Sequence, residues 1–346
     1  MSSLRIACCV ALAVPSLALA TVGASEAGLG GGYTVGAGVT RAGVTVYPVI
    51  ASGSAKMMED DQIVPFADAL LQGALTVTEA GHNMEIASLR VHNRGKHSVL
   101  VMAGEIVEGG QQDRVITQDL LLQPSDEPVI VQVNCVERGR WSGGQGFAYG
   151  GRAEVGLRRV VQVRRNQDAT WEAVASINQG KGGMLNALGY DSYAMAPSTG
   201  TYMASMRSGV LERQVAKAAS ELSEEIAKEG NVVGVVVAVG GSIVGTEVYG
   251  YAEVWEQVRD TTLAAAARDG MTRQTYGTWT AAPTQLVAAT FLQSAIGGEA
   301  VEVTARGLAT HTTVQSDDAL SYVLADADGE LLHLASYRRD DVIGQF

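Results

Sequence analysis

The stretch VVGVVVAVGGSIVGTEVY (residues 232–249) contains two runs rich in β-branched side chains around a central pair of glycines. Valine-rich runs of this length are typical of strands. Two successive glycines suit the tight turn of a hairpin, in which both turn positions take a positive φ. The stretch therefore predicts an antiparallel hairpin that turns at Gly240 and Gly241.

Helical patterns lie on both sides of this hairpin. Residues 210–229 repeat apolar side chains at helical spacing, and Gly230 follows as a stop signal. The expected buried face of this helix consists of Leu211, Val215, Leu222 and Ile226. Another helix is expected to be capped by Asp168 and to end at Gly180. The other segments with helical spacing are 153–164, 252–268 and 283–296.

Strands are expected in the first half of the chain and at its C-terminal end. Residues 86–91 and 97–102 are expected to pair as a hairpin, and 115–122 and 129–136 give two more extended segments. Four short runs separated by turn residues predict a C-terminal meander: 301–304, 310–314, 320–324 and 331–337. This order, without strict alternation, favours an α+β fold over a doubly wound sheet. We predict a strand-rich N-terminal half, a helical middle and antiparallel C-terminal strands, in mixed sheets with helices packed on them.

The N-terminus has the pattern of a secretory signal peptide. A positive charge at Arg5 precedes the apolar run 6–20, which ends in the small-residue pattern of a cleavage site. The run is shorter than the roughly 20 residues of a membrane span; an uncleaved anchor or a buried helix is the alternative. We therefore expect a signal peptide (1–24), a glycine-rich flexible leader (25–43) and a single α+β domain (44–346). The mature protein is expected to be periplasmic, in the cell envelope or secreted, without stable membrane insertion.

Composition limits the partners and cofactors that the chain is expected to have. The formal net charge is −12, and an acidic surface disfavours nucleic acid, because phosphate binding needs a basic face. Cys8 and Cys9 lie in the signal run, so Cys135 is the one cysteine expected in the mature chain, without an intramolecular disulfide. We find neither a zinc-ligand spacing nor a Walker or dinucleotide fingerprint, and we therefore expect no metal and no cofactor. The oligomeric state stays open.

Polar residues gather in two segments, GEIVEGGQQDRV (104–115) and VNCVERGRW (133–141). If the extended parts of these segments are neighbouring strands, their ends bring carboxylates, amides, guanidinium groups and an indole together. Arginine binds pairs of oxygens through its fork and tryptophan stacks on planar groups, so this set favours a polar, planar or anionic ligand. Glu105 and Glu137 are the candidate catalytic acid or base. The candidate ligand-binding residues are Gln112, Arg114, Arg140 and Trp141.

The same residues have a purely structural interpretation. Glu and Arg near turns commonly form ion pairs of little energy, and amides often satisfy backbone groups at strand ends. Cys135 is a candidate nucleophile, but a free cysteine more often packs in the core, so we expect it to be buried and unreactive. Convergence of the candidate side chains in a pocket would indicate a ligand site, whereas side chains that spread into solvent would indicate a structural role.

The two polar segments, together with the hairpin stretch, resemble the ARG and rhodanese-phosphatase-superfamily-associated protein family, in which ARG stands for ADP-ribosylglycohydrolase. The resemblance covers residues 44–346, as one domain, and is most specific at 109–115 and 135–141. The family usually has Asn where this chain has Asp113. The family has no settled activity. Its name implies an ADP-ribose-like or phosphorylated nucleotide ligand, although association alone is not chemistry.

Two classes of function stay open. One is an exported ligand-binding or interaction module for a polar or anionic ligand, of the ADP-ribose or nucleotide type that the resemblance implies. The other is a hydrolase acting on such a substrate, with Glu105 or Glu137 as acid or base and Arg140 holding the anion. No sequence motif supplies a nucleophile or a metal triad, so we favour binding.

Overall fold

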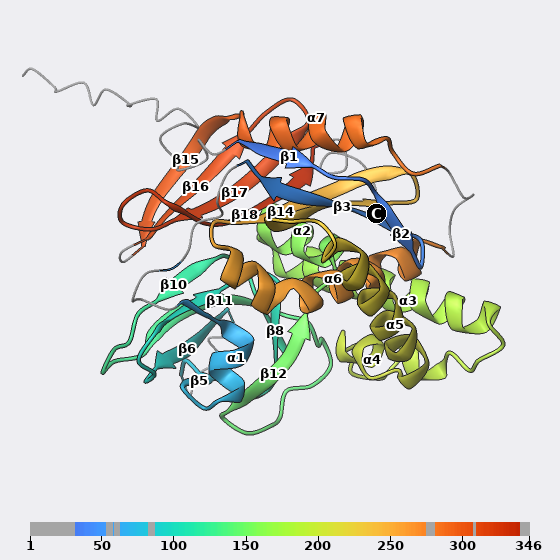
Figure 1. Ribbon diagram of the computed structural model, residues 1–346. Helices are drawn as coiled ribbons and strands as arrows, with labels where there is room; N and C mark the ends of the chain where they lie inside the picture. Colours follow the sequence, from blue (N-terminus) through green and yellow to red (C-terminus); the bar gives the residue numbers. More distant parts are fainter. Residues whose placement is uncertain are drawn as a thin grey trace, which may run out of the picture.

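The computed structural model describes residues 32–52, 58, 63–81, 87–274, 281–306 and 309–339. Within these residues the chain has an α+β fold, as predicted, with helices packed on three sheets (Figure 1). The expected signal peptide (1–24) lies outside the described part of the chain. No described helix combines the length and the apolar character that crossing a membrane requires.

The largest sheet described has nine strands and includes the predicted hairpin. In this hairpin β13 (Val232–Val239) pairs antiparallel with β14 (Ser242–Tyr249), and Gly240 and Gly241 have φ angles of 58° and 83°. Every residue of β13 is buried, which accounts for its continuous apolar sequence. The other strands of the sheet are β1 (Tyr33–Val35), β2 (Val39–Arg41), β3 (Val44–Ala51), β15 (Glu299–Arg306), β16 (Ala309–Gln315), β17 (Ala319–Ala325) and β18 (Leu331–Arg338).

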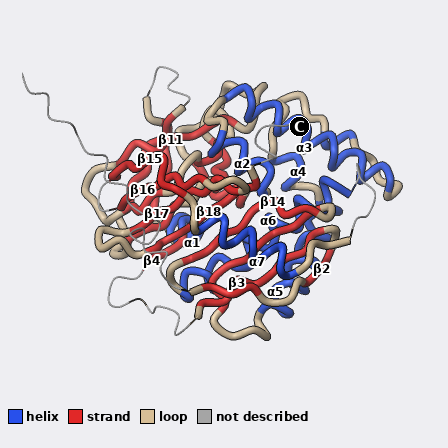
Figure 2. Tube along the Cα trace, turned by 90° about the horizontal axis from the view of Figure 1, so that it is seen from above, coloured by secondary structure: helices blue, strands red, loops and turns tan. Residues whose placement is uncertain are grey.

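Helices cover both faces of the nine-stranded sheet. α7 (Gln285–Ile296) lies over one face, where Phe291 and Leu292 pack among valines of the strands (Figures 1 and 2). α5 (Gly209–Ile226) and α6 (Ala252–Gln274) contribute to the core on the other face. The four apolar residues predicted to form the inner face of α5 are all buried, which confirms that prediction.

The first half of the chain forms the two smaller sheets. One has six strands in the order β12-β8-β9-β11-β6-β5, and the other has the order β10-β7-β4, with β4 parallel to β7. Both sheets share a core of Val and Leu side chains with Phe66 of α1. The elements are β4 (Ile63–Pro65), α1 (Phe66–Leu71), β5 (Leu75–Glu79), β6 (Ser88–Asn93), β7 (Ser98–Val101), β8 (Glu105–Gly109), β9 (Arg114–Ile116), β10 (Leu120–Leu122), β11 (Val129–Cys135) and β12 (Phe147–Arg152).

The prediction of a helical middle is confirmed, but one helix, α3, begins and ends at other residues than predicted. Asn166, not Asp168, caps α3, since its side chain accepts from the backbone N–H groups of Asp168 and Ala169. α3 also continues past Gly180, which lies buried inside the helix, and Gly182 lies close to Ser192 and Met195. The elements are α2 (Val155–Val163), α3 (Gln167–Ala187), the 3-10 turn η2 (Tyr193–Met195) and α4 (Met203–Met206).

The expected hairpin of residues 86–91 and 97–102 is wrong. β6 pairs with β5 and β11, whereas β7 pairs with β10 and β4, so the two strands belong to different sheets. The buried Asn93 side chain donates to the carbonyls of His97 and Leu122, both at 2.9 Å. These two bonds direct the chain out of the six-stranded sheet and into the three-stranded one.

The expected flexible leader is also corrected, because its second half is folded. β1 and β2 lie within it and both pair antiparallel with β3. A Cβ placed on Gly38 would come within 2.6 Å of the Tyr47 ring, and one on Gly36 within 2.7 Å of Pro48. The glycines here permit close packing against β3. Composition alone did not distinguish this role from flexibility.

Candidate functional site

Arg140 is the centre of a cluster that ties two strand ends together. Its Nε donates to Glu137 Oε2 at 2.7 Å, and its Nη2 donates to Asp113 Oδ1 at 2.9 Å. The remaining N–H groups reach the backbone carbonyls of Gly110 (2.8 Å), Ser142 (3.1 Å) and Gly109 (3.0 Å). A guanidinium has five N–H donors, and all five have protein acceptors. A ligand could therefore use the Arg140 fork only by displacing one of them.

Asp113 extends this cluster toward the segment after η2. Its Oδ2 accepts from Thr201 Oγ1 at 2.9 Å, and its Oδ1 accepts from the Gly109 N–H as well as from Arg140. Burial, followed by the nearby charge of Glu137, raises the pKa of Asp113. Both oxygens of this carboxylate are thus occupied by donors of the chain, which gives the residue a structural role here.

Gln112 and Arg114 are fully buried beside the same strands. Arg114 Nη1 donates to the Gln112 carbonyl at 2.5 Å, and its Nη2 lies 3.8 Å from Glu79. Cys135 is 0% exposed, and burial raises the pKa of its thiol. The prediction that Cys135 is buried is therefore confirmed.

Glu105 belongs to a different buried network, formed by β8, β12, α2 and β14. Its pKa is raised by burial, although the neighbouring charge of Arg152 acts in the opposite direction. Glu247 lies 2.6 Å from Arg152 and also bonds Arg158. Burial would raise the pKa of Glu247, but these two guanidinium groups outweigh burial and hold it well below its ordinary value. The two predicted carboxylates, Glu105 and Glu137, thus interact with different arginines.

His333 joins this network from β18. Its Nδ1 lies 2.6 Å from Asp119 Oδ2, and its Nε2 lies 3.5 Å from Glu247. Burial lowers the pKa of His333, but the two carboxylates outweigh burial and raise it overall. Since Asp119 lies between β9 and β10, this pair connects the strand-rich half to the nine-stranded sheet.

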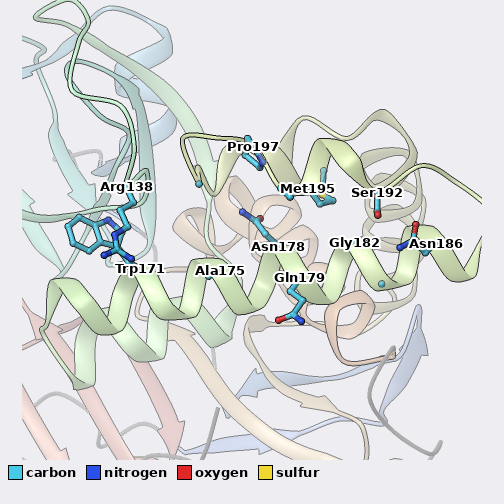
Figure 3. Close-up of a pocket in the computed structure, with 13 residues that line it drawn as sticks. Arg138, Trp171, Ala175, Asn178, Gln179, Gly182, Asn186, Ser192, Met195 and Pro197 are labelled. Atoms are coloured by element: carbon cyan, nitrogen blue, oxygen red, sulfur yellow. The ribbon is translucent and has the colours of Figure 1, made fainter.

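A cavity of about 660 Å³ lies next to the Arg140 cluster, between α3 and the segment 192–200 (Figure 3). This volume falls within the range of small-molecule sites in proteins. Of the predicted site residues, none lines it, and Trp141 is 48% exposed elsewhere. The lining residues are Arg138, Trp171, Ala175, Asn178, Gln179, Gly182, Gly183, Asn186, Ser192, Met195, Ala196, Pro197 and Gly200.

The cluster nevertheless forms part of the framework of this cavity. The Gly139 N–H donates to the Thr199 carbonyl at 2.7 Å, and Gln112 Nε2 lies 3.4 Å from the carbonyl of Arg138. Thr201, bonded to Asp113, in turn accepts at its carbonyl from Asn178 Nδ2 at 3.0 Å. The predicted polar residues therefore position the walls of the cavity without contacting its interior.

Arg138 and Trp171 form one end of the cavity. The Arg138 guanidinium carbon lies 5.3 Å from the centre of the Trp171 ring, in a cation–π contact. Figure 3 shows both side chains at the same end, with Asn178 further along α3 and Asn186 at the far end. Arg138 is the one charged side chain among the lining residues of the described part. The cavity therefore combines a cation, an aromatic face and amide groups in one groove.

Sequence reasoning missed this groove because it spans three distant segments. A usable signal was present in α3: Trp171, Ala175, Asn178, Gly182 and Asn186 recur at spacings of three and four residues. Apart from Trp171 these residues are small or polar, and they occupy one stripe of a helix whose other positions include a buried apolar set. Within this stripe Asn178 and Gly182 are buried and Ala175 and Asn186 are exposed, as on a helix surface that lines a groove.

Comparison with protein-family models matches residues 32–337 to a model described as the ARG and Rhodanese-Phosphatase-superfamily-associated Protein domain. The match begins at the first described strand and ends on the last one, so it covers the three sheets and the helices together. Comparison with curated proteins and with solved structures found no match.

Proposed function

This chain belongs to the ARG and Rhodanese-Phosphatase-superfamily-associated Protein family, and on that premise we propose that it binds a small anionic, nucleotide-like ligand in the groove between α3 and residues 192–200. ADP-ribose and mononucleotides are the candidate ligand class. In this proposal the ligand's anionic group contacts Arg138, and its planar part lies along α3.

The observation that carries the proposal is the Arg138–Trp171 pair at one end of an otherwise uncharged groove. The chain as a whole has a net charge of −12. Against this negative background Arg138, the one charged side chain of the described lining, attracts an anion to the groove. The indole of Trp171 orients the Arg138 guanidinium by stacking. Because Arg138 is exposed, the N–H donors of the guanidinium stay available to a ligand. Arginine in this setting suits carboxylate or phosphate oxygens.

Binding is favoured over hydrolysis because the cavity lining described contains no carboxylate. The candidate acids Glu105 and Glu137 are 3% and 4% exposed. Glu137 Oε2 already accepts from Arg140 and from the backbone N–H of Asp113. General acid–base catalysis needs a carboxyl within hydrogen-bond reach of the substrate. The alternative, a hydrolase that uses these carboxylates with Arg140, therefore needs a rearrangement of the cluster.

The binding test is isothermal titration of the mature chain with adenosine 5′-monophosphate, ADP-ribose and uncharged adenosine. We expect the two anionic compounds to bind and to raise the melting temperature, and adenosine to bind at least tenfold more weakly.

Ala175→Leu should abolish binding, because the added side chain occupies the groove. Ala187→Leu is the matched control, since Ala187 is an exposed alanine of the same helix outside the lining. Absence of binding by all compounds would refute the proposal.

Turnover is checked in the same samples. Chromatography of ADP-ribose after incubation with the protein should recover the compound intact. Release of ribose 5-phosphate or AMP, lost in Glu137→Gln but not in Glu172→Gln on the exposed surface of α3, would instead support the hydrolase.

We also propose that the protein is exported, from the charged start, apolar run and small-residue ending of residues 1–24. The mature N-terminus should then be Thr21 or Ser25 when the protein is recovered from outside the cytoplasm and examined by mass spectrometry. Recovery of an intact chain beginning at Met1 from the membrane fraction would contradict export by cleavage.

A further inference from the structure

We infer that the groove selects a ligand whose anionic group is terminal, so that a nucleoside 5′-monophosphate binds in preference to ADP-ribose, whose pyrophosphate is internal. The inference rests on the proposed function and chooses between the two types of ligand that it names. It follows from the position along the groove of Arg138, the one cation of the described lining.

The groove ends at Trp171 because the first turns of α3 are bonded to β11. Gln167 precedes Trp171 by four residues, so the two side chains lie on the same stripe of the helix. Gln167 accepts from the Cys135 N–H at 2.7 Å and donates to the Cys135 carbonyl at 2.8 Å. Beside it, Asn134 Nδ2 donates to Thr170 Oγ1 at 2.8 Å. A strand therefore covers this stripe before Trp171, and a ligand cannot continue along the helix past that residue.

Toward its other end the groove narrows between α3 and the segment 192–200. A Cβ built on Gly182 would lie 3.5 Å from the Met195 Cβ and 3.6 Å from the Ser192 Cβ, so there is no space for a ring at this point. Gly182 follows Trp171 by eleven residues, which is about 16 Å along a helix axis. A mononucleotide is shorter than this stretch, whereas extended ADP-ribose, which has a second phosphate and a second ribose, is longer.

Two other cations close to the groove are held by the protein. Lys181 of α3 is 2% exposed, and its Nζ lies 2.8 Å from Glu154 and 3.2 Å from Ser205 Oγ. Arg140 has a protein acceptor for each of its five donors. Within the described part of the chain, Arg138 is thus the cation that a ligand in the groove can reach.

An anionic group further along the groove would lose hydration without gaining a cation. Every other lining residue described is uncharged, and a charge taken out of water without a partner costs free energy. The exposed Asp191, next to the lining Ser192, adds a negative charge toward the far end. A terminal phosphate can meet Arg138 while the uncharged remainder of the ligand lies in the groove. The pyrophosphate of ADP-ribose has a bulky group on each side, so it reaches Arg138 only if one of these groups leaves the groove.

The experiment compares adenosine 5′-monophosphate with ADP-ribose by isothermal titration at pH 8. The two compounds then carry nearly the same charge, because the second pKa of a phosphomonoester is about 6. Ala196→Arg adds a cation to the wall of the groove between Met195 and Pro197, which Figure 3 shows opposite the middle of the α3 stretch. Ala187→Arg adds the same charge on the surface of α3 outside the lining and is the matched control. Both alanines are exposed, and melting transitions check that the variants fold.

We expect the native chain to bind adenosine 5′-monophosphate at least about fivefold more tightly than ADP-ribose. Ala196→Arg should reduce this preference to about twofold or less, since the added guanidinium can pair with the internal pyrophosphate, and Ala187→Arg should keep it. Equal or tighter binding of ADP-ribose by the native chain would overturn the inference and leave the proposed function standing. A preference unchanged in Ala196→Arg would also overturn it, because the position of the cation would then not be the cause. Failure of both compounds to bind the native chain would refute the proposed function itself.

Discussion

Arg140→Lys should destabilise the fold without removing a ligand contact. Arg140 makes five hydrogen bonds, two of them to the carboxylates of Glu137 and Asp113, and its side chain is 25% exposed. A lysine ammonium has three donors and no fork, so at least two of the five bonds are lost. Net values for such bonds predict a loss of about 2–4 kcal/mol in the free energy of unfolding.

Arg138→Lys is the matched substitution, two residues away in the same turn. Arg138 is exposed, and its described contact is the stacking on Trp171. Its replacement should cost less than about 1 kcal/mol of stability, because exposed cation–π contacts are weak. It should weaken the binding of adenosine 5′-monophosphate by about tenfold, through loss of the bidentate fork.

The assay is urea unfolding followed by Trp fluorescence, with titration of the same samples at 25 °C. An unchanged m-value would show that the two variants unfold from the same compact state. The expected pattern is opposite in the two variants: Arg140→Lys loses stability and Arg138→Lys loses affinity. If Arg140→Lys is as stable as the native chain and no longer binds, Arg140 contacts the ligand, and the assignment of its five donors to the framework is wrong.

Three further predictions concern buried and capping residues. The stability that His333 contributes through Asp119 should be complete below its ordinary pKa of 6.5 and decline as pH rises through the raised pKa of the folded state. The difference in unfolding free energy between the native chain and His333→Gln should therefore narrow as pH rises above 6.5, and a constant difference would contradict this. Cys135 should react slowly with thiol reagents in the folded protein, and rapid labelling at neutral pH would restore it as a candidate nucleophile. Asn166→Ala should lower the unfolding free energy by about 1 kcal/mol, since α3 loses two capping bonds, whereas the same change at Asp168 should have a smaller effect.

Local chemistry was sufficient to predict several elements from the sequence. The hairpin of β13 and β14 follows from valine-rich runs around Gly240 and Gly241, because strand preference and turn geometry act within a few residues. The buried face of α5 follows from helical spacing, and the burial of Cys135 follows from the usual place of a free thiol. None of these predictions needed knowledge of a distant segment.

Strand pairing was harder to predict from the sequence, because it depends on contacts between segments that are far apart in the chain. Residues 86–102 contain two strands and a turn, which is the local pattern of a hairpin. The strands separate because Asn93 bonds His97 and Leu122, and because β5 and β11 offer β6 longer partners. Nothing in the sequence near the turn indicates which strands β6 and β7 pair with.

The site shows the same division between residue type and position. The sequence identified where arginines, carboxylates and a tryptophan gather, but a guanidinium can satisfy its donors on a ligand or on the protein equally well. The carbonyls of Gly109 and Gly110 lie within reach of Arg140, so this arginine became part of the framework, while Arg138 was left facing a cavity made by α3 and residues 192–200. The residue types follow from the sequence alone; their assignment to framework or cavity depends on which acceptors the tertiary structure brings within hydrogen-bond distance.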